Sequence, residues 1–262
     1  MTFPQLASGS VAQYSIQRVR RSGAARIDTP GGASIQGPAS GAQSMEWLIG
    51  YRGMTGAEAG ELRAFFEQCR GRLGTFLFLD PLANLLSSSE ELAGSLWQKQ
   101  AGVVVSAGGW DAGIRGRIHV VTNGGAGEAG IAQTVAADRE RQYALSGYVR
   151  SAGGASVVFR VSAGAEAVQA VESAGTVWKR VYLPVRFAME GTGLACGVSV
   201  HGGGSVEVCG LQLEAQQAPG VYKPSAIAGG VFPEARFGMD ELLITAEDDD
   251  RFRADVMVYA EI

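Results

Sequence analysis

Histidine and cysteine are scarce in this chain of 262 residues, which limits the chemistry it can perform. The two histidines, His119 and His201, lie far apart in the sequence. The three cysteines, Cys69, Cys196 and Cys209, are odd in number and form no CxxC pair, so they signal neither a disulfide framework nor a zinc site. We therefore expect no metal ion and no other cofactor.

Clusters of like charge and long apolar runs are absent too. The 22 Lys and Arg residues are scattered, and with 26 Asp and Glu residues the net charge is −4. Nucleic-acid binding needs a basic stripe, so no specific nucleic-acid partner is expected. No apolar run approaches the roughly 18 residues that span a bilayer, and the N-terminus lacks the order of a secretory signal. We expect a soluble protein, made in the cytoplasm and not inserted in a membrane.

Recognisable catalytic motifs are also absent, since there is no GxSxG, HExxH, P-loop or Cys/His pairing. An enzyme that cleaves glycans needs two carboxylates about 5 to 10 Å apart across a sugar cleft. The available carboxylates include Asp80, Asp111, Glu128, Asp138 and Asp240, and none of them lies in a catalytic motif. The sequence predicts a protein that is not an enzyme and has no catalytic residues.

Glycine, in contrast, is abundant. The 38 glycines are about twice the number that average usage of roughly 7% would give. Such a supply favours many turns between short strands. With 46% hydrophobic residues, the chain is long enough for two compact units, each with a core of its own.

The N-terminal part predicts two strands around a glycine-rich segment. "SVAQYSIQRVRR" and "SMEWLIGYRG" alternate apolar and polar residues, and the second places Met45, Trp47, Ile49 and Tyr51 on one face. The intervening "TPGGASIQGPASGAQ", residues 29–43, is rich in Pro and Gly. We expect either disorder or a long hairpin there.

One α-helix is predicted, over about residues 55–70. Thr55 is its expected N-cap, Glu58 completes a capping box, and Gly71 ends the helix. The apolar stripe that we expect to pack on a sheet comprises Leu62, Phe65, Phe66 and Cys69. Cys69 is thus interpreted as a buried, inert thiol.

The C-terminal segment "MDELLITAEDDDRFRADVMVYAEI" predicts a closing hairpin with its turn at residues 247–250. The alternating apolar residues of its second strand are Phe252, Ala254, Val256, Val258 and Ala260. The four acids of the turn lack the spaced glycine and terminal Glu of a calcium loop. We interpret them as a solvated turn.

The middle of the chain, from residue 84 to about 225, predicts β structure alone. Helix signals vanish there, and short strand patterns such as "IRGRIHVVTN" and "ASVVFRVSA" alternate with Gly-rich turns. This pattern is typical of a β-sandwich or jelly roll.

Two cysteines flank the turn "HGGG" in this middle part and suggest a hairpin. The register that keeps valines opposite one another pairs Val200 with Val206. This register directs Cys196 and Cys209 to opposite faces, so both are predicted to be free thiols. A bulge near Gly210 would return the following leucines to the core face.

Four segments of the middle part resemble carbohydrate-binding jelly-roll modules, especially those of bacteriophage tail proteins. They are "NLLSSSEELAGSLW", "IAQTVAADRERQYALSGYVRS", "TVWKRVYLPV" and "VEVCGLQLEAQQAPGVYKPS". The opening NLL and the closing GLQLE are the most specific parts of this resemblance.

The outer segments resemble a second family, the tail-tube-like domain of phage distal tail proteins. The similar segments are "WLIGYRGMTGAEAGELRAFFEQCRGRLGTFLFLDP" and "ARFGMDELLI…VMVYAEI". This resemblance rests on a strand, helix, strand order and an FF…FxFxDP pattern.

Together the two resemblances imply a mainly β protein, in which a tail-tube-like β-sandwich with one packed α-helix is interrupted by an inserted β jelly roll. The expected domains are residues 1–83 (first part of the hub), 84–225 (jelly-roll module) and 226–262 (completing strands). Antiparallel neighbours tolerate such an insertion at a loop.

The resemblances also imply a function. Distal tail proteins form hexameric rings that join the tail tube to the host-binding tip, so the expected partners are five further copies, the tail tube, tail-tip proteins and host surface polysaccharide. The expected location is the tip of the virion tail. Two alternatives stay open: a glycan depolymerase or hydrolase that carries a carbohydrate-binding module, and a purely structural jelly roll.

A sugar site is sought among the four tryptophans, because aromatic rings stack on sugar faces. Three have a structural explanation: Trp47 lies on the alternating strand face, and Trp97 and Trp178 match core positions of the resembled module. Trp110 lies in the glycine-rich "SAGGWDAGIRG", interpreted as a loop. With Arg115 and Arg117 as donors it forms the predicted carbohydrate site, although an ordinary loop anchor is an alternative.

Overall fold

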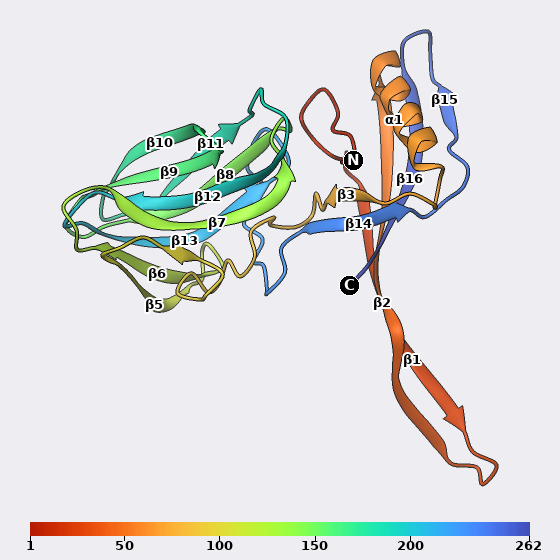
Figure 1. Ribbon diagram of the computed structural model, residues 1–262, viewed down its shortest axis with the longest axis horizontal. Helices are drawn as coiled ribbons and strands as arrows, with labels where there is room; N and C mark the ends of the chain where they lie inside the picture. The colour runs from red at the N-terminus through yellow and green to blue at the C-terminus, as the bar shows by residue number, and fades with distance from the viewer. The chain divides into compact units, whose positions relative to one another are not determined.

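The computed structural model describes residues 1–23, 26–37 and 43–262, which form two compact units (Figure 1). Unit 1 comprises Met1–Ala7, Ala12–Phe78 and Phe232–Ile262, and unit 2 comprises Ser8–Val11 and Leu79–Val231. Within these described residues, no helix has both the length and the apolar character to cross a membrane.

Unit 1 is built on one antiparallel sheet. Its strand order is β1 (Ile16–Asp28), β2 (Ser34–Met54), β16 (Phe252–Glu261), β14 (Val231–Phe237) and β3 (Phe76–Leu79), with β15 (Ile244–Ala246) also paired to β16. On β2 the predicted alternation is confirmed, because Trp47, Ile49 and Tyr51 are buried. Their neighbours on β16 are equally apolar, since Trp47 is opposite Val258. One face of the sheet is therefore a continuous core surface.

The sheet of unit 1 bends over its own core. The ring of Phe78 on β3 lies 4.8 Å from that of Trp47 on β2, although two strands separate them in the sheet order. Phe232 also lies 4.8 Å from Trp47. In Figure 1, β3 and β14 accordingly run across β2 and β16. The aromatic rings fill the space between the two halves.

The single helix of the described residues, α1 (Gly56–Cys69), follows the sequence prediction closely. Thr55 is the N-cap, and the capping box with Glu58 is complete. The helix ends one residue before the predicted stop, because Arg70 adopts the left-handed conformation with φ 54°. Phe65 contacts Phe76 and Phe237, at centroid distances of 5.2 and 5.9 Å, which packs the predicted stripe on the sheet.

Both hairpins of unit 1 close through tight turns. β1 and β2 form a long hairpin in which Ile27 is opposite Ile35, while residues 38–42 of the glycine-rich segment lie outside the described residues. β15 and β16 form the predicted C-terminal hairpin. In its turn, Glu247 N donates to Arg251 O at 2.7 Å, so the acidic run is a turn as predicted.

Unit 2 is a sandwich of two five-stranded antiparallel sheets, the jelly-roll class that the sequence predicts. The first sheet contains β10 (Glu166–Ala174), β9 (Ala155–Ala163), β12 (Thr192–Val200), β7 (Ala129–Asp138) and β4 (Gln98–Lys99). The second sheet contains β11 (Lys179–Val185), β8 (Tyr143–Arg150), β13 (Ser205–Glu214), β6 (Gly116–Asn123) and β5 (Val103–Asp111). Phe159, Leu145 and Val208 are among the fully buried side chains between them.

The predicted hairpin around "HGGG" is wrong. β12 pairs with β7 and β9, whereas β13 pairs with β6 and β8, so the turn carries the chain from one sheet to the other. Val200 and Val206 are therefore not a cross-strand pair. A glycine-rich turn of this length can close a hairpin within one sheet or carry the chain to the other sheet. The alternation of apolar residues in the strands does not distinguish these two connections.

The prediction of free thiols is nevertheless confirmed. Cys69, Cys196 and Cys209 are all free and buried. The predicted bulge is present too, because the pairing of β13 with β8 shifts register between Cys209 and Gln212, with φ 64° at Gly210. It brings Leu211 and Leu213 into the core.

The two chain segments that begin and end unit 2 lie side by side. Asp80 N donates to Gly230 O, and Gly230 N donates to Asn84 O, each at 2.8 Å. Asn84 also donates from its side chain to Leu211 O at 3.0 Å. The chain thus leaves and returns at one place.

Candidate functional site

The outward face of the second sheet of unit 2 carries a row of polar side chains on buried strands. Val208 and Val149 point into the sandwich, so the residues before and after them point outward. Glu207 on β13 is opposite both Arg150 on β8 and Val120 on β6. These three side chains therefore form one row across three strands.

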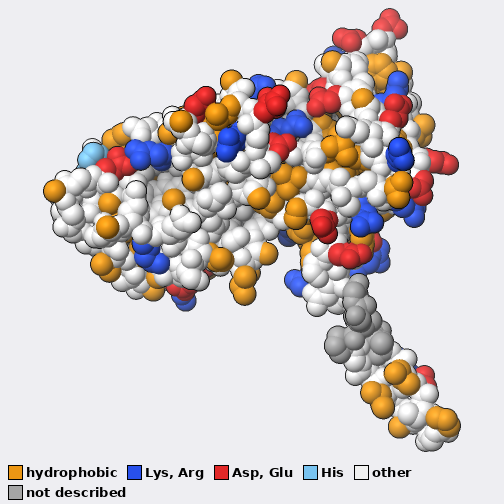
Figure 2. All heavy atoms as spheres, viewed as in Figure 1, with side chains coloured by type: hydrophobic (Ala, Val, Ile, Leu, Met, Phe, Trp, Pro, Cys, Tyr) orange, Lys and Arg blue, Asp and Glu red, His pale blue; other side chains and the backbone are white. Residues whose placement is uncertain are grey.

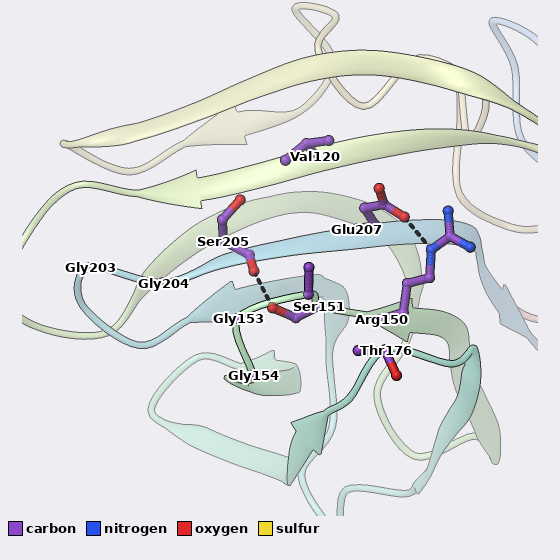
Figure 3. Close-up of a pocket in the computed structure, with 11 residues that line it drawn as sticks. Val120, Arg150, Ser151, Gly153, Gly154, Thr176, Gly203, Gly204, Ser205 and Glu207 are labelled. Carbon is purple, nitrogen blue, oxygen red and sulfur yellow. Dashed lines mark hydrogen bonds and ion pairs between the residues drawn. The ribbon is translucent and has the colours of Figure 1, made fainter.

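This row is the floor of a cavity of about 590 Å³ (Figure 3). Two turns rich in glycine form its rim, one after β8 and one before β13. Ser151 Oγ donates to Ser205 O at 2.8 Å and links the rim to the floor. The side chains of the remaining walls are small and uncharged. They leave room for a polar ligand and offer it hydrogen-bonding groups.

Arg150 is held in place on two sides. Its Nε donates to Glu207 Oε2, and its guanidinium lies 4.3 Å from the ring centroid of Trp178. The indole Nε1 of Trp178 in turn donates to Asp111 Oδ2 at 2.8 Å. A stacked guanidinium that is also hydrogen-bonded loses little freedom when it binds a ligand.

The bond between Trp178 and Asp111 joins opposite edges of the sheet. Trp178 precedes β11, the strand at one edge, and Asp111 ends β5, the strand at the other. Asp111 Oδ1 also accepts from Ile114 N at 2.8 Å and Gly113 N at 2.9 Å. These bonds, chiefly the one from Ile114, lower the pKa of Asp111, so it is ionised at neutral pH.

The other end of the same face is covered by the chain after β13. Glu214 accepts from Gly220 N at 2.8 Å and from Lys223 Nζ at 2.5 Å. Arg180, whose guanidinium lies over the ring of Tyr148 at 5.3 Å, donates to Gly220 O. The open part of the face is therefore the end that Arg150 occupies.

The structure places the three residues predicted to bind sugar outside this cavity. Trp110 is 62% exposed and lies in β5 rather than in a loop, because its two preceding glycines form a bulge in the strand. It is opposite Arg117, while Arg115 lies in the following turn with φ 63°. As the neighbour of Asp111 along the strand, Trp110 points to the opposite face of the sheet.

Arg117 is also engaged elsewhere. Its Nη1 forms an ion pair with Glu91 at 3.0 Å, and its backbone N donates to Glu90. The structure therefore brings Trp110 and Arg117 together as a cross-strand pair, but not with the cavity floor.

The other two tryptophans of unit 2 differ in burial. Trp97 is buried, as predicted, whereas Trp178 is only half buried and lies on the outward face, which corrects its interpretation as a core residue.

Arg150 and Glu207 are not predicted as site residues from the sequence. Their one sequence signal is a charged residue inside an otherwise apolar strand, in "YVRS" and "SVEVC", and nothing local shows that the two strands pair.

Several carboxylates considered for catalysis have structural roles. Asp80 accepts from Leu82 N at 2.8 Å, Glu128 pairs with Arg160 at 2.9 Å, and Asp240 pairs with Arg72 at 3.3 Å. Across the described residues, no cluster of three or more His, Cys, Asp or Glu side chains could hold a metal ion. Figure 2 shows acidic and basic side chains interspersed on the face in view.

No known family model matches the chain. No curated protein matches it either. Among solved structures, a tailspike protein 4 domain of bacteriophage CBA120 is 14% identical with a TM-score of 0.43, over 52% of this chain and 22% of that one. The CBM22-1 xylan-binding domain of Paenibacillus barcinonensis Xyn10C is 18% identical with a TM-score of 0.41, over 52% and 96%.

A third solved structure, the C-terminal family 22 carbohydrate-binding module of Clostridium thermocellum Xyn10B, is 12% identical with a TM-score of 0.43. It covers 54% of this chain and 99% of that one. The chain thus spans about a fifth of the tailspike domain and nearly all of the two modules.

Proposed function

We propose that unit 2 binds carbohydrate in the cavity above Arg150 and Glu207. The observation that carries the proposal is the arrangement of this pair. Arg150 uses Nε for Glu207, and its Nη groups have no partner among the described residues. A sugar hydroxyl both donates and accepts, so one donor and one acceptor fixed side by side suit it.

We also propose a setting for this activity, namely a phage or prophage tail tip. The sequence resemblance of the outer segments supports assigning unit 1 as the hub of a distal tail adaptor, assembled as a hexameric ring between the tail tube and the host-binding tip. Unit 2 is then the arm that binds host surface glycan, and the protein is located in the virion.

We propose further that the protein is not an enzyme. Cleavage of a glycosidic bond needs one carboxyl group that is protonated in the resting state. Asp111, a carboxylate linked to Arg150 through Trp178, has a lowered pKa and is ionised. Release of new reducing ends from a bound polysaccharide would favour the alternative, a hydrolase.

Arg150→Ala tests the binding proposal. Loss of charged hydrogen bonds should weaken affinity for a polysaccharide that the intact protein binds, by about tenfold or more in calorimetric titration. Arg160→Ala is the matched control, because Arg160 on β9 of the first sheet also forms an ion pair, with Glu128, the residue before β7. Equal losses in both variants, or no binding to any glycan by the intact protein, would contradict the proposal and favour a purely structural jelly roll.

Native mass spectrometry tests the ring. We expect a species of six copies at micromolar concentration. A protein that stays monomeric at every concentration, and also in the presence of isolated tail tubes, would remove the adaptor proposal while leaving the sugar proposal standing.

A further inference from the structure

Carboxylates outnumber cations behind the floor of the cavity. Glu207 is bonded to Arg150, and Asp111 reaches the same guanidinium through Trp178. Glu90 lies beside Cys209, because a Cβ atom on Gly116, the residue opposite Asp111, would be 3.1 Å from Cys209 Sγ and 3.4 Å from Glu90 Oε1. Glu207 and Asp111 therefore flank one guanidinium, and Glu90 lies farther away, beside Cys209.

The partners of these acids do not neutralise them. Asp111 accepts from backbone N–H groups and an indole. Glu90 accepts from the hydroxyl of Tyr222 and the backbone of Arg117. The guanidinium of Arg117 is paired with another acid, Glu91. The bonds to Asp111 lower its pKa and so stabilise the ionised carboxylate without neutralising its charge.

The rest of the cavity supplies no compensating charge. Arg150 is the one basic residue in its lining, and the other walls are Val120, Ala152, serines, a threonine and glycines. A ligand in the cavity therefore meets one arginine that is already engaged by Glu207 in the lining and, through Trp178, by the charge of Asp111 behind it.

We infer that the site selects uncharged sugars and discriminates against glycans that carry carboxylates, such as uronic acids. This inference rests on the proposed function. Two adjacent sugar hydroxyls can accept from an Nη group of Arg150 and donate to Oε1 of Glu207, the oxygen that is not bonded to Arg150. A ligand carboxylate offers no proton to Glu207, competes with it for Arg150, and is repelled by Asp111 behind Trp178.

A glycan array with uncharged and uronate-bearing bacterial polysaccharides, probed with the full-length protein, tests this selection. The bound members should be uncharged. For the strongest of them, an oligosaccharide and its analogue oxidised to the uronate at C6 form a matched pair. The uronate should bind about tenfold more weakly at low salt, and the difference should shrink in about 0.5 M salt because screening weakens repulsion.

Two variants test whether these carboxylates cause the weaker binding of the uronate. Asp111→Asn and Glu207→Gln each remove the charge and keep one of the two acceptor oxygens, so each should narrow the affinity difference between the paired ligands. Glu128→Gln removes a carboxylate next to β7 of the first sheet and should leave the affinity difference between the two ligands unchanged. Thermal melting of each variant shows whether it is folded, and the salt dependence of the intact protein provides the test if a variant is not.

The outcomes separate the two proposals. Binding of uronates as tightly as, or more tightly than, their uncharged partners would overturn the selection while leaving carbohydrate binding intact. Failure of the intact protein to bind any array member would overturn the proposed function, and this inference with it.

Discussion

Single residues decide where the polar site of unit 2 lies. Trp178 and Trp110 look similar in sequence, each near a strand end, yet one stacks on Arg150 and the other points to the opposite face. Sequence reasoning placed Trp110 in a loop because two glycines precede it. Those glycines instead form a bulge, and the choice between loop and bulge depends on pairing with β6, which no local pattern records.

Asp111 gives a prediction at this scale. Its folded pKa is lowered, so the stability that it contributes is present above its ordinary pKa of 3.8 and is lost as the pH falls through the lower, folded value. Asp111→Asn should lower the free energy of unfolding by about 1 kcal/mol at pH 7, and this deficit should shrink toward pH 2. Thermal melts of both proteins between pH 7 and 2 measure it. A deficit that is constant with pH would mean that the carboxylate charge contributes nothing.

At the scale of elements, the sequence predicted what is local and missed what is not. The capping box of α1 involves two residues three positions apart, and it formed as expected. The alternation on β2 and the C-terminal hairpin are equally local. Which sheet receives β13 after β12 depends on the packing of ten strands, so an apolar alternation on each side of "HGGG" could not reveal that the chain changes sheets.

The helix cap supplies the prediction at this scale. Thr55→Ala removes the oxygen that accepts from Glu58 N and should cost about 1 kcal/mol in the free energy of unfolding. Urea denaturation followed by circular dichroism at 222 nm checks this, with Arg63→Ala on the exposed side of α1 as a control expected within about 0.5 kcal/mol of the wild type. If both substitutions cost the same, the cap does not stabilise the helix.

For the whole molecule, the two units have separate cores. Trp47, Phe65, Phe78 and Phe237 fill that of unit 1, and all four belong to segments outside the long insertion. The core of unit 2 lies between its own two sheets. Each unit therefore has the apolar interior that independent folding requires.

Deletion of residues 81–229 tests this independence. The flanking residues are already adjacent, because Asp80 N lies 2.8 Å from Gly230 O, so a short Gly/Ser linker should join them without strain. Val11→Ser should accompany the deletion, because Val11 is buried as part of unit 2. We expect a soluble product with a cooperative melt that retains the helix signal. A molten product, with residues 79–231 also unfolded when expressed alone, would show that the two cores depend on each other.

The adjacency of Asp80 and Gly230 also has a genetic meaning. Two crossovers in the gene, one near each of these codons, exchange all of unit 2 except Ser8–Val11 and leave the segments that encode the surrounding strands and helix in frame. A donor module needs ends that lie equally close together and a surface on which Val11 can pack. Under the proposed function, glycan specificity then changes in one recombination step, without intermediates whose cores are half rebuilt.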